Sequence, residues 1–281
     1  MTGQQPLPVR KLPAARGLAW LSGSWSLIKR QPLRLLLISL FFQFFLGFSQ
    51  VQAIGLLVIL CLPILSAGML HAFYLVERNE KPILAILFLP ITVKLSASRL
   101  LLLGGVVIVM GLLVASLVMT GQMLEIDPDV LKRIEQGDLD ALQLIDPQMI
   151  ETALIAMAIG AAVSGSITYF SVPLIWFSHQ GLGKALTIGL KGLVRNWKPL
   201  LVIGLLLGVL AVPIILLFGS FYLSALGGGA SSTWLGFLVL LLGPMFQLLL
   251  FGTQYLAFRD IFGLEETPVE NGENTRDQLV A

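Results

Sequence analysis

The sequence predicts an all-α protein that crosses a membrane several times, and three observations lead to this prediction. First, 56% of its 281 residues are hydrophobic and only 12% are charged, whereas soluble domains carry about 25% charged residues. Second, the hydrophobic residues form runs long enough for helices that cross a hydrocarbon layer of about 30 Å. Third, the short segments of alternating polarity that characterise membrane β-barrels do not occur. The predicted class is a polytopic α-helical membrane protein.

We expect one membrane domain, over residues 17–262, with six transmembrane helices arranged as three hairpins. The flanking segments, 1–16 and 263–281, are rich in proline or in polar and acidic residues. Such composition predicts disorder, and both segments are assigned to the cytoplasm. The predicted spans cover residues 33–48, 53–76, 100–120, 151–178, 199–221 and 233–257, with an outer loop over 121–150.

Residues 17–31 are predicted to form a short amphipathic helix that lies in the headgroup layer of the membrane. Apolar residues recur at helical spacing from Leu18 to Ile28, and the basic residues Lys29 and Arg30 follow. Basic residues and tryptophan beside an apolar face are typical of such interfacial helices. The alternative is a helix that simply leads into the first span.

Two further surface segments precede the later hairpins, so that each hairpin is entered through a basic segment. Residues 77–99 leave and re-enter the membrane surface between the second and third spans. Residues 182–198 are predicted to form another basic amphipathic helix with leucines along one side. Its basic stripe comprises Lys184, Lys191, Arg195 and Lys198.

The longest hydrophilic stretch, residues 121–151, is predicted to hold a short amphipathic helical hairpin. Asp127-Pro128 and Asp146-Pro147 each fit an N-cap followed by proline at the first helical position. We therefore expect helices to begin at residues 128 and 147.

The distribution of basic residues predicts the orientation. Of the 18 Lys and Arg residues, all but Lys132 and Arg133 fall on the side that holds both ends of a six-span chain. Basic residues accumulate in cytoplasmic loops. Both termini are therefore predicted to be cytoplasmic in a bacterial inner (cytoplasmic) membrane, with the outer loop on the opposite side.

Two stretches of the chain resemble each other and indicate an internal repeat. Residues 63–78 and 244–259 both begin with proline and are apolar enough to lie in lipid. A real repeat of a transmembrane helix is one interpretation, and a chance register among leucines is the other. Aligned on the prolines, Tyr74 falls on Tyr255, Leu75 on Leu256 and Arg78 on Arg259.

Three prolines lie in the spans that run from the outer to the inner side: Pro63, Pro173 and Pro244. A proline in a lipid-buried helix leaves a carbonyl without its usual donor, which neighbouring groups must satisfy. The prolines are predicted to bend helices and shape the bundle, or alternatively to break helices and create a pathway.

Three short segments carry a resemblance to a known group of proteins. They are Arg30-Gln31-Pro32-Leu33, residues 63–68 (PILSAG) and residues 193–200 (LVRNWKPL). With the order of basic segments and leucine-rich spans, they resemble uncharacterised bacterial six-span membrane proteins. Those proteins look related to the membrane domain attached to some glycerophosphodiester phosphodiesterases. The resemblance covers most of residues 18–260 and implies a six-helix fold and an inner-membrane location, but no reaction.

The predicted span interiors contain no Asp, Glu, Lys or Arg. Ionisable residues are costly inside a membrane and are retained where catalysis or ion coupling needs them, so the sequence favours a protein that is not an enzyme. Motifs for zinc hydrolysis, phosphate loops and serine nucleophiles are also missing. No cofactor and no metal site is expected.

The two histidines, His71 and His179, lie near the inner ends of their predicted spans. On one helix, His71, Tyr74 and Arg78 share a face. Amphipathic rings and long cations favour the depth of the headgroups, so ordinary anchoring is one interpretation. A metal pair or a headgroup-binding site is the other.

Small residues predict close helix packing in two spans. Gly204 and Gly208 form a GxxxG motif in the fifth span, and Gly160 and Gly165 contribute to a small-residue face in the fourth. Such faces let helix backbones approach each other closely. They serve packing within the bundle or, alternatively, dimerisation.

Membrane lipids, above all anionic ones, are the expected partners because the basic residues follow the membrane surface. Another membrane protein or a second copy of the chain is a further candidate partner, whereas nucleic acid is not an expected partner. The candidate headgroup-binding residues are Arg30, Arg34, Arg78, Lys191, Arg195, Lys198 and Arg259.

These observations predict an integral membrane protein with a non-enzymatic role, as a scaffold, an accessory subunit or a component of envelope homeostasis. The alternative is a small transporter or channel for an apolar or lipidic substrate, with its pathway at the proline bends.

Overall fold

The computed structural model describes residues 8–119, 127–135, 144, 146–226 and 232–263, and all regular structure in these residues is helical. The predicted all-α class is therefore confirmed. The elements are α1 (Arg16–Arg30), α2 (Pro32–Gly47), η1 (Phe48–Gln50), α3 (Gln52–Glu77), η2 (Leu84–Phe88), α4 (Leu89–Thr92), α5 (Lys94–Met119), α6 (Pro128–Glu135), α7 (Pro147–Trp176), α8 (Leu182–Arg195), α9 (Trp197–Leu226) and α10 (Ser232–Phe262).

Five helices in the described part of the chain are long and apolar enough to cross a membrane: α3, α5, α7, α9 and α10. The remaining predicted span, 33–48, corresponds to α2, which is apolar but has only 16 residues. At 1.5 Å per residue it is about 24 Å long, shorter than a typical hydrocarbon layer. The chain is thus compatible with a multi-pass membrane protein.

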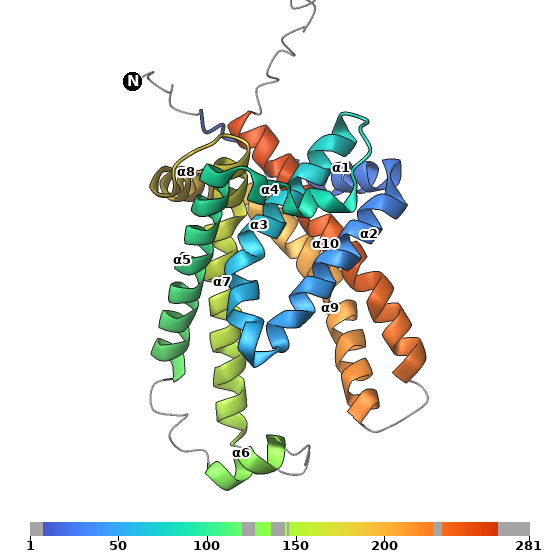
Figure 1. The fold of residues 1–281 in the computed structure, drawn as a ribbon, viewed down its shortest axis with the longest axis vertical. Coiled ribbons are helices and arrows are strands. Elements are labelled where there is room, and N and C mark those ends of the chain that lie inside the picture. The colour runs from blue at the N-terminus through green and yellow to red at the C-terminus, as the bar shows by residue number, and fades with distance from the viewer. Residues whose placement is uncertain (1–7, 120–126, 136–143, 145, 227–231, 264–281) are drawn as a thin grey trace, which may run out of the picture.

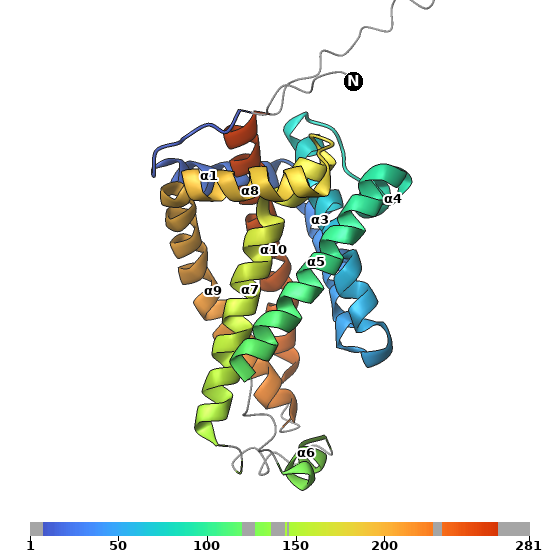
Figure 2. The same ribbon diagram turned by 90° about the vertical axis from the view of Figure 1, so that its left-hand side faces the viewer.

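The helices α1 and α8 lie across the ends of the long helices rather than parallel to them (Figures 1 and 2). Each is separated from the next helix by one non-helical residue, Gln31 (φ −141°, ψ 56°) after α1 and Asn196 (φ −115°, ψ 29°) after α8. Residues 17–31 therefore belong to a separate helix that does not continue into α2. The predicted surface helix over 182–198 is shorter than expected, because Trp197 already begins α9.

The buried core lies at the end of the molecule where α1 and α8 are found. It includes residues 64–76 of α3, 170–176 of α7 and 248–262 of α10, together with the inner faces of α1 and α2. We call this half the packed end. It also holds the ends of α3 and α10 at Glu77 and Phe262 (Figure 1).

The opposite half has far fewer buried side chains, and we call it the splayed end. It comprises residues 109–117 of α5, 208–221 of α9 and 234–242 of α10, where most large apolar side chains are exposed. Figure 1 shows α9 and α10 standing apart from α5 and α7 in this half, with α6 beyond the end of α7. Exposed apolar surface of this kind suits a lipid solvent.

The three predicted prolines, Pro63, Pro173 and Pro244, are all buried, and α3, α7 and α10 continue through them. Near the last of them, Ser39 of α2 donates its hydroxyl to the Pro244 carbonyl at 3.1 Å. This bond joins α2 to α10 at the proline, but the carbonyl that Pro244 leaves without its helical donor is that of Leu240, four residues earlier.

Close backbone approaches occur at glycines other than those of the GxxxG motif. A Cβ added at Gly204 or Gly208 would meet nothing within 4 Å, so the packing expected of them inside the bundle is not found. A Cβ at Gly68 would instead lie 2.5 Å from the Leu87 Cα, and one at Gly104 would collide with the Leu60 carbonyl. Glycine at these two positions lets α3 approach its neighbours.

Both predicted N-caps of the outer loop are confirmed. Pro128 begins α6 and Pro147 begins α7. The Asp127 carboxylate accepts the Asp129 backbone N–H, and the Asp146 carboxylate accepts that of Gln148, both at 2.9 Å. The second half of the predicted hairpin, at 136–143, and the predicted tail, at 264–281, lie outside the described residues.

Residues 8–15 differ from the disorder predicted for the N-terminus. The Arg10 backbone N–H donates to the Ile261 carbonyl at 2.9 Å, and the Leu12 backbone N–H donates to the Asn196 side chain at 2.9 Å. This segment is therefore fixed on the packed end between α8 and α10. Proline-rich composition did not predict it, because its partners come from distant parts of the chain.

Candidate functional site

A polar network joins the end of α3 to α10. Glu77, the last residue of α3, accepts a hydrogen bond from the Tyr255 hydroxyl at 2.5 Å and pairs with the Arg259 guanidinium. The Tyr255 side chain is fully buried, whereas Glu77 and Arg259 are partly exposed. Partly exposed ion pairs are individually weak. The specificity of the contact between α3 and α10 therefore depends on the hydrogen bond from the buried tyrosine to Glu77.

The same network reaches α1 through Asp260. This carboxylate is only 10% exposed, and it accepts the Trp20 indole N–H at 3.0 Å and an Arg259 N–H at 3.1 Å. It also pairs with Arg16 of α1. A buried carboxylate needs such partners because desolvation penalises an unpaired charge. The network therefore fastens α1, α3 and α10 together at the packed end.

A small cavity of about 250 Å³ lies beside this network. Its lining includes three arginines and two carboxylates, of which Arg16, Arg259, Glu77 and Asp260 already pair with each other. The remaining arginine, Arg30, donates to the Glu77 backbone carbonyl at 3.3 Å. Most of the charge here is thus balanced within the protein.

A second cavity, of about 460 Å³, lies where α8 meets α9, and we call it the basic pocket. Its charged residues come from three elements: Lys11 from the N-terminal segment, Arg195 from α8 and Lys198 from α9. Among the described residues, no carboxylate lines it. The other lining residues are Leu12, Val194, Trp197 and Pro199.

The shape of the basic pocket depends on Asn196, whose side chain is fully buried. Its Oδ1 accepts the Leu12 backbone N–H, and its Nδ2 donates to the Arg10 carbonyl, both at 2.9 Å. Nδ2 also lies 3.2 Å from the Gly192 carbonyl in the last turn of α8. One amide therefore ends α8 and holds the segment that carries Lys11. Sequence reasoning missed this role, because asparagine after a helix is common and its distant partner leaves no local signal.

The candidate headgroup residues do not form one site. Arg195 and Lys198 line the basic pocket, and Lys191 lies in an adjoining groove of α8 with Thr187, Leu190, Val194 and Arg195. Arg30 and Arg259 belong to the network of α1, α3 and α10. Arg78 stacks on Tyr74 of its own helix, 5.0 Å from the ring centre, and Arg34 lies 3.5 Å from the Pro82 carbonyl.

The residues of the predicted repeat have different partners in the two helices. In α3, Arg78 bonds to Tyr74 one turn earlier. In α10, Tyr255 and Arg259 both bind Glu77 of α3. The shared Tyr-x3-Arg spacing thus gives a local contact in one helix and an interhelical contact in the other. The internal repeat remains a prediction.

His71 belongs to an aromatic cluster between α3 and α7. Its Nδ1 accepts the Trp176 indole N–H at 3.1 Å, and its ring lies 6.1 Å from that of Phe177. His179 instead offers its backbone carbonyl to Arg99 at 2.7 Å. Both interactions secure the packed end.

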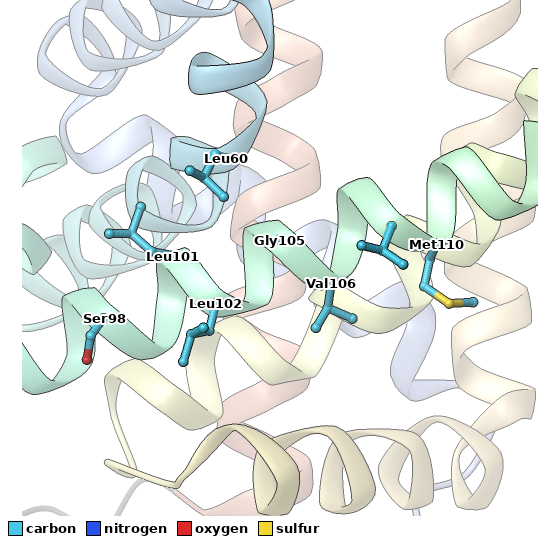
Figure 3. Close-up of a pocket in the computed structure, with 8 residues that line it drawn as sticks. Leu60, Ser98, Leu101, Leu102, Gly105, Val106 and Met110 are labelled. Carbon is cyan, nitrogen blue, oxygen red and sulfur yellow. The ribbon is translucent and has the colours of Figure 1, made fainter.

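An apolar groove with a volume of about 780 Å³ follows one face of α5 (Figure 3). Leu60 of α3 borders it, and Leu101, Leu102, Val106 and Met110 point into it from α5. The other lining residues are Ser98, Gly105 and Val109. Its surface is almost entirely hydrocarbon and suits an acyl chain rather than a polar ligand.

No protein-family model, curated relative or solved structure matches this chain. The resemblance to the membrane domain of glycerophosphodiester phosphodiesterases therefore remains a prediction.

The long helices carry no Asp, Glu, Lys or Arg between their terminal turns. Charged residues occur in α3 only at Glu77, in α5 up to Arg99, in α7 up to Glu151, and in α10 from Arg259 onward. Proton relays and membrane-embedded acid–base chemistry need ionisable groups at depth.

Proposed function

We propose that this protein is a non-enzymatic, multi-pass component of the bacterial inner membrane that acts as a scaffold or accessory subunit of the envelope. The observation that carries the proposal is the separation of charge from the spans. The ionisable residues of the packed end join α1, α3 and α10 or lie on its surface. A rigid polar end with a lipid-exposed apolar end suits a structural partner of other membrane components.

We include α2 as a sixth span. Consecutive long elements pack in pairs, α2 with α3, α5 with α7, and α9 with α10, which supports three hairpins. The shortness of α2 is tolerated where the bilayer thins locally or a helix at the surface leads into the span, at a modest free-energy cost. The helix α1 lies in this position, crosswise at the start of α2 (Figure 1).

We assign the packed end to the cytoplasmic side. Among the described residues, Lys132 and Arg133 of α6 are the basic residues at the other end, and the rest lie at the packed end. The positive-inside rule supports this orientation. Each Lys or Arg near an anionic leaflet contributes about 1 kcal/mol to membrane attraction, which suits the exposed cations of α8.

Labelling of single cysteines tests the orientation. In a Cys61→Ser background, Thr187→Cys on α8 should react with a membrane-impermeant maleimide only after the cells are opened. Asp129→Cys on α6 should react in intact spheroplasts. Labelling of Thr187→Cys from outside would overturn the assignment.

Native mass spectrometry of the protein, extracted gently from its own membrane, tests the scaffold role. A partner protein at fixed stoichiometry supports the proposal. A chain that carries only a defined lipid or small molecule contradicts it and favours the second candidate.

The second candidate is a transporter for an apolar or lipidic substrate, favoured by the apolar groove on α5. If the groove carries such a substrate, Gly105→Leu, which fills it without a contact at the Cβ position, should abolish movement of a labelled lipid across proteoliposomes. Wild-type transport by this variant would exclude the groove as a pathway.

A further inference from the structure

The basic pocket is distinguished by charge that the described residues leave uncompensated. Its cations, Lys11, Arg195 and Lys198, come from three separate elements and converge on one cavity of about 460 Å³. Within the described part of the chain none of the three has a carboxylate partner. Like charges held close together repel, and an anion between them removes that repulsion.

Two arginines of the network that joins α1, α3 and α10 differ from the cations of the basic pocket, because they have carboxylate partners. Arg16 pairs with Asp260 there, and Arg259 pairs with Glu77. Among the described residues, the same end of the molecule therefore holds one assembly whose charge is mostly balanced by its own carboxylates and one that is lined by no carboxylate. The second has charge available for an external anion.

The pocket is built by buried contacts and is more than a chance grouping of surface lysines. Asn196 fixes the backbone of the Lys11 segment through bonds to both Arg10 and Leu12. Pro199, at the other side of the pocket, is buried beneath α1, because a Cβ added at Gly17 would lie 2.6 Å from its carbonyl oxygen. The backbones that carry Lys11 and Lys198 are thus both held in place.

Apolar side chains at the pocket indicate that its ligand has a hydrocarbon part. Trp197 is 57% exposed and Val194 is 66% exposed, although both line the pocket. The adjoining groove of α8 continues from Val194 to the exposed Leu190. Cations beside exposed apolar side chains are typical of the boundary between headgroups and acyl chains.

We propose that the basic pocket binds the phosphate of an anionic glycerophospholipid, with the adjoining groove of α8 against the upper part of its acyl chain. Lys11, Arg195 and Lys198 contact the phosphate oxygens, since ammonium and guanidinium groups are the usual donors to phosphate. Asn196 is a positioning residue that acts through the Lys11 segment. The inference rests on the proposed function in placing α8 at the membrane surface.

Titration of the detergent-solubilised full chain with phosphatidylglycerol, followed by native mass spectrometry, tests the proposal. The double variant Lys11→Gln with Lys198→Gln should bind phosphatidylglycerol roughly 25-fold more weakly, since each lysine near an anionic lipid is worth a factor of about five. Lys184→Gln, which changes an exposed lysine of α8 outside the pocket, is the matched control and should bind as wild type. Equal affinity of the double variant and the control would overturn the proposal.

Two further arms identify the source of the phosphate. Phosphatidylcholine should bind at least tenfold more weakly, and equal binding of the two lipids would show that headgroup charge is not recognised. Inorganic phosphate at millimolar concentration should not displace phosphatidylglycerol, because it lacks the acyl chain. Displacement by inorganic phosphate would overturn the lipid assignment in favour of a soluble phosphate ligand.

Asn196→Ala tests whether Asn196 positions the segment that carries Lys11. It keeps all three cations, but it should weaken phosphatidylglycerol binding and speed amide exchange at residues 10–12 together. Faster exchange with unchanged binding would show that the segment is not part of the site. The cysteine-labelling experiment tests the orientation of the protein, and its result does not depend on lipid binding. A wrong orientation can therefore be told apart from a wrong ligand.

Discussion

The packed end and the splayed end are both built from apolar helices, yet they differ in how much they bury. In an 18-residue apolar stretch of Ile54–Glu77 in α3 half of the residues are buried, whereas in such a stretch of Trp197–Phe221 in α9 6% are, although α9 is the more apolar of the two. Apolarity thus predicts entry into the membrane and does not predict contact between helices. Lipid surrounds a leucine as favourably as another helix does.

What separates the two ends is the presence of small and polar residues. At the packed end, the Ser39 hydroxyl bonds to Gln247 at 2.6 Å, and the Gln254 amide donates to the Tyr169 carbonyl at 2.7 Å. Gly68 lets α3 lie directly against η2. Interhelical hydrogen bonds and close backbone approach are the forces that hold helices together in lipid. At the splayed end, Ser220 bonds to the Leu216 carbonyl of its own helix.

The largest expected effect is at Gly68. Gly68→Leu places side-chain atoms against the backbone of Leu87 and Ile86, and overpacking of this kind costs about 3 kcal/mol of stability or more. The melting temperature in detergent should fall sharply. Gly208→Leu at the splayed end, where a Cβ meets nothing within 4 Å, should leave the melting temperature nearly unchanged. Similar losses at both sites would remove the distinction between the two ends.

A smaller loss is expected from Asp260→Ala. It leaves the Trp20 indole without its acceptor and removes the partner of Arg16. Because both arginines are more than a third exposed, solvent screens the ionic part, and about 2 kcal/mol is expected mainly from the lost hydrogen bonds. Asp129→Ala on α6 is the control. Thermal unfolding of both variants provides the measurement, and a larger shift for the control would contradict the network's role.

Asn196→Ala should destabilise the packed end by about 1–2 kcal/mol, because it removes a buried amide with three hydrogen-bond partners. Since the contacts lie at one edge of the packed end, the effect should be local. Hydrogen exchange should accelerate at residues 10–12 and stay unchanged in residues 64–76 of α3. Uniform acceleration throughout the chain would instead indicate global unfolding.

The smallest expected effect is that of Ser39→Ala, which removes a hydroxyl bonded to Gln247 and Pro244 between α2 and α10. Interhelical hydrogen bonds in membranes average about 0.6 kcal/mol, so the melting temperature should fall only slightly. Ser220→Ala at the splayed end should not lower it at all. Since α2 is the shortest predicted span, a larger loss would show that its docking depends on this contact.

Several features were predictable because their causes are local in the chain. The N-caps Asp127 and Asp146 act within two residues, and both were found where the Asp-Pro pairs stand. The separate helix α1 follows from apolar spacing and from Pro32, which begins α2. On α8, however, Ala185, Gly189 and Gly192 form the buried face, whereas Leu190 is exposed. Of the predicted leucine stripe, Leu190 therefore faces outward, whereas Leu186 and Leu193 pack against the core beside the small residues.

The sequence by itself determined the helical membrane class, the positions of the long helices and the charge-free interior of the spans. These properties depend on the composition of short segments. Only the tertiary structure decided that Gly68 is enclosed while Gly208 is open, that Glu77 joins Arg259, and that Asn196 holds Leu12. Each depends on groups far apart in the chain, and in lipid the apolar pattern does not specify which helices will meet.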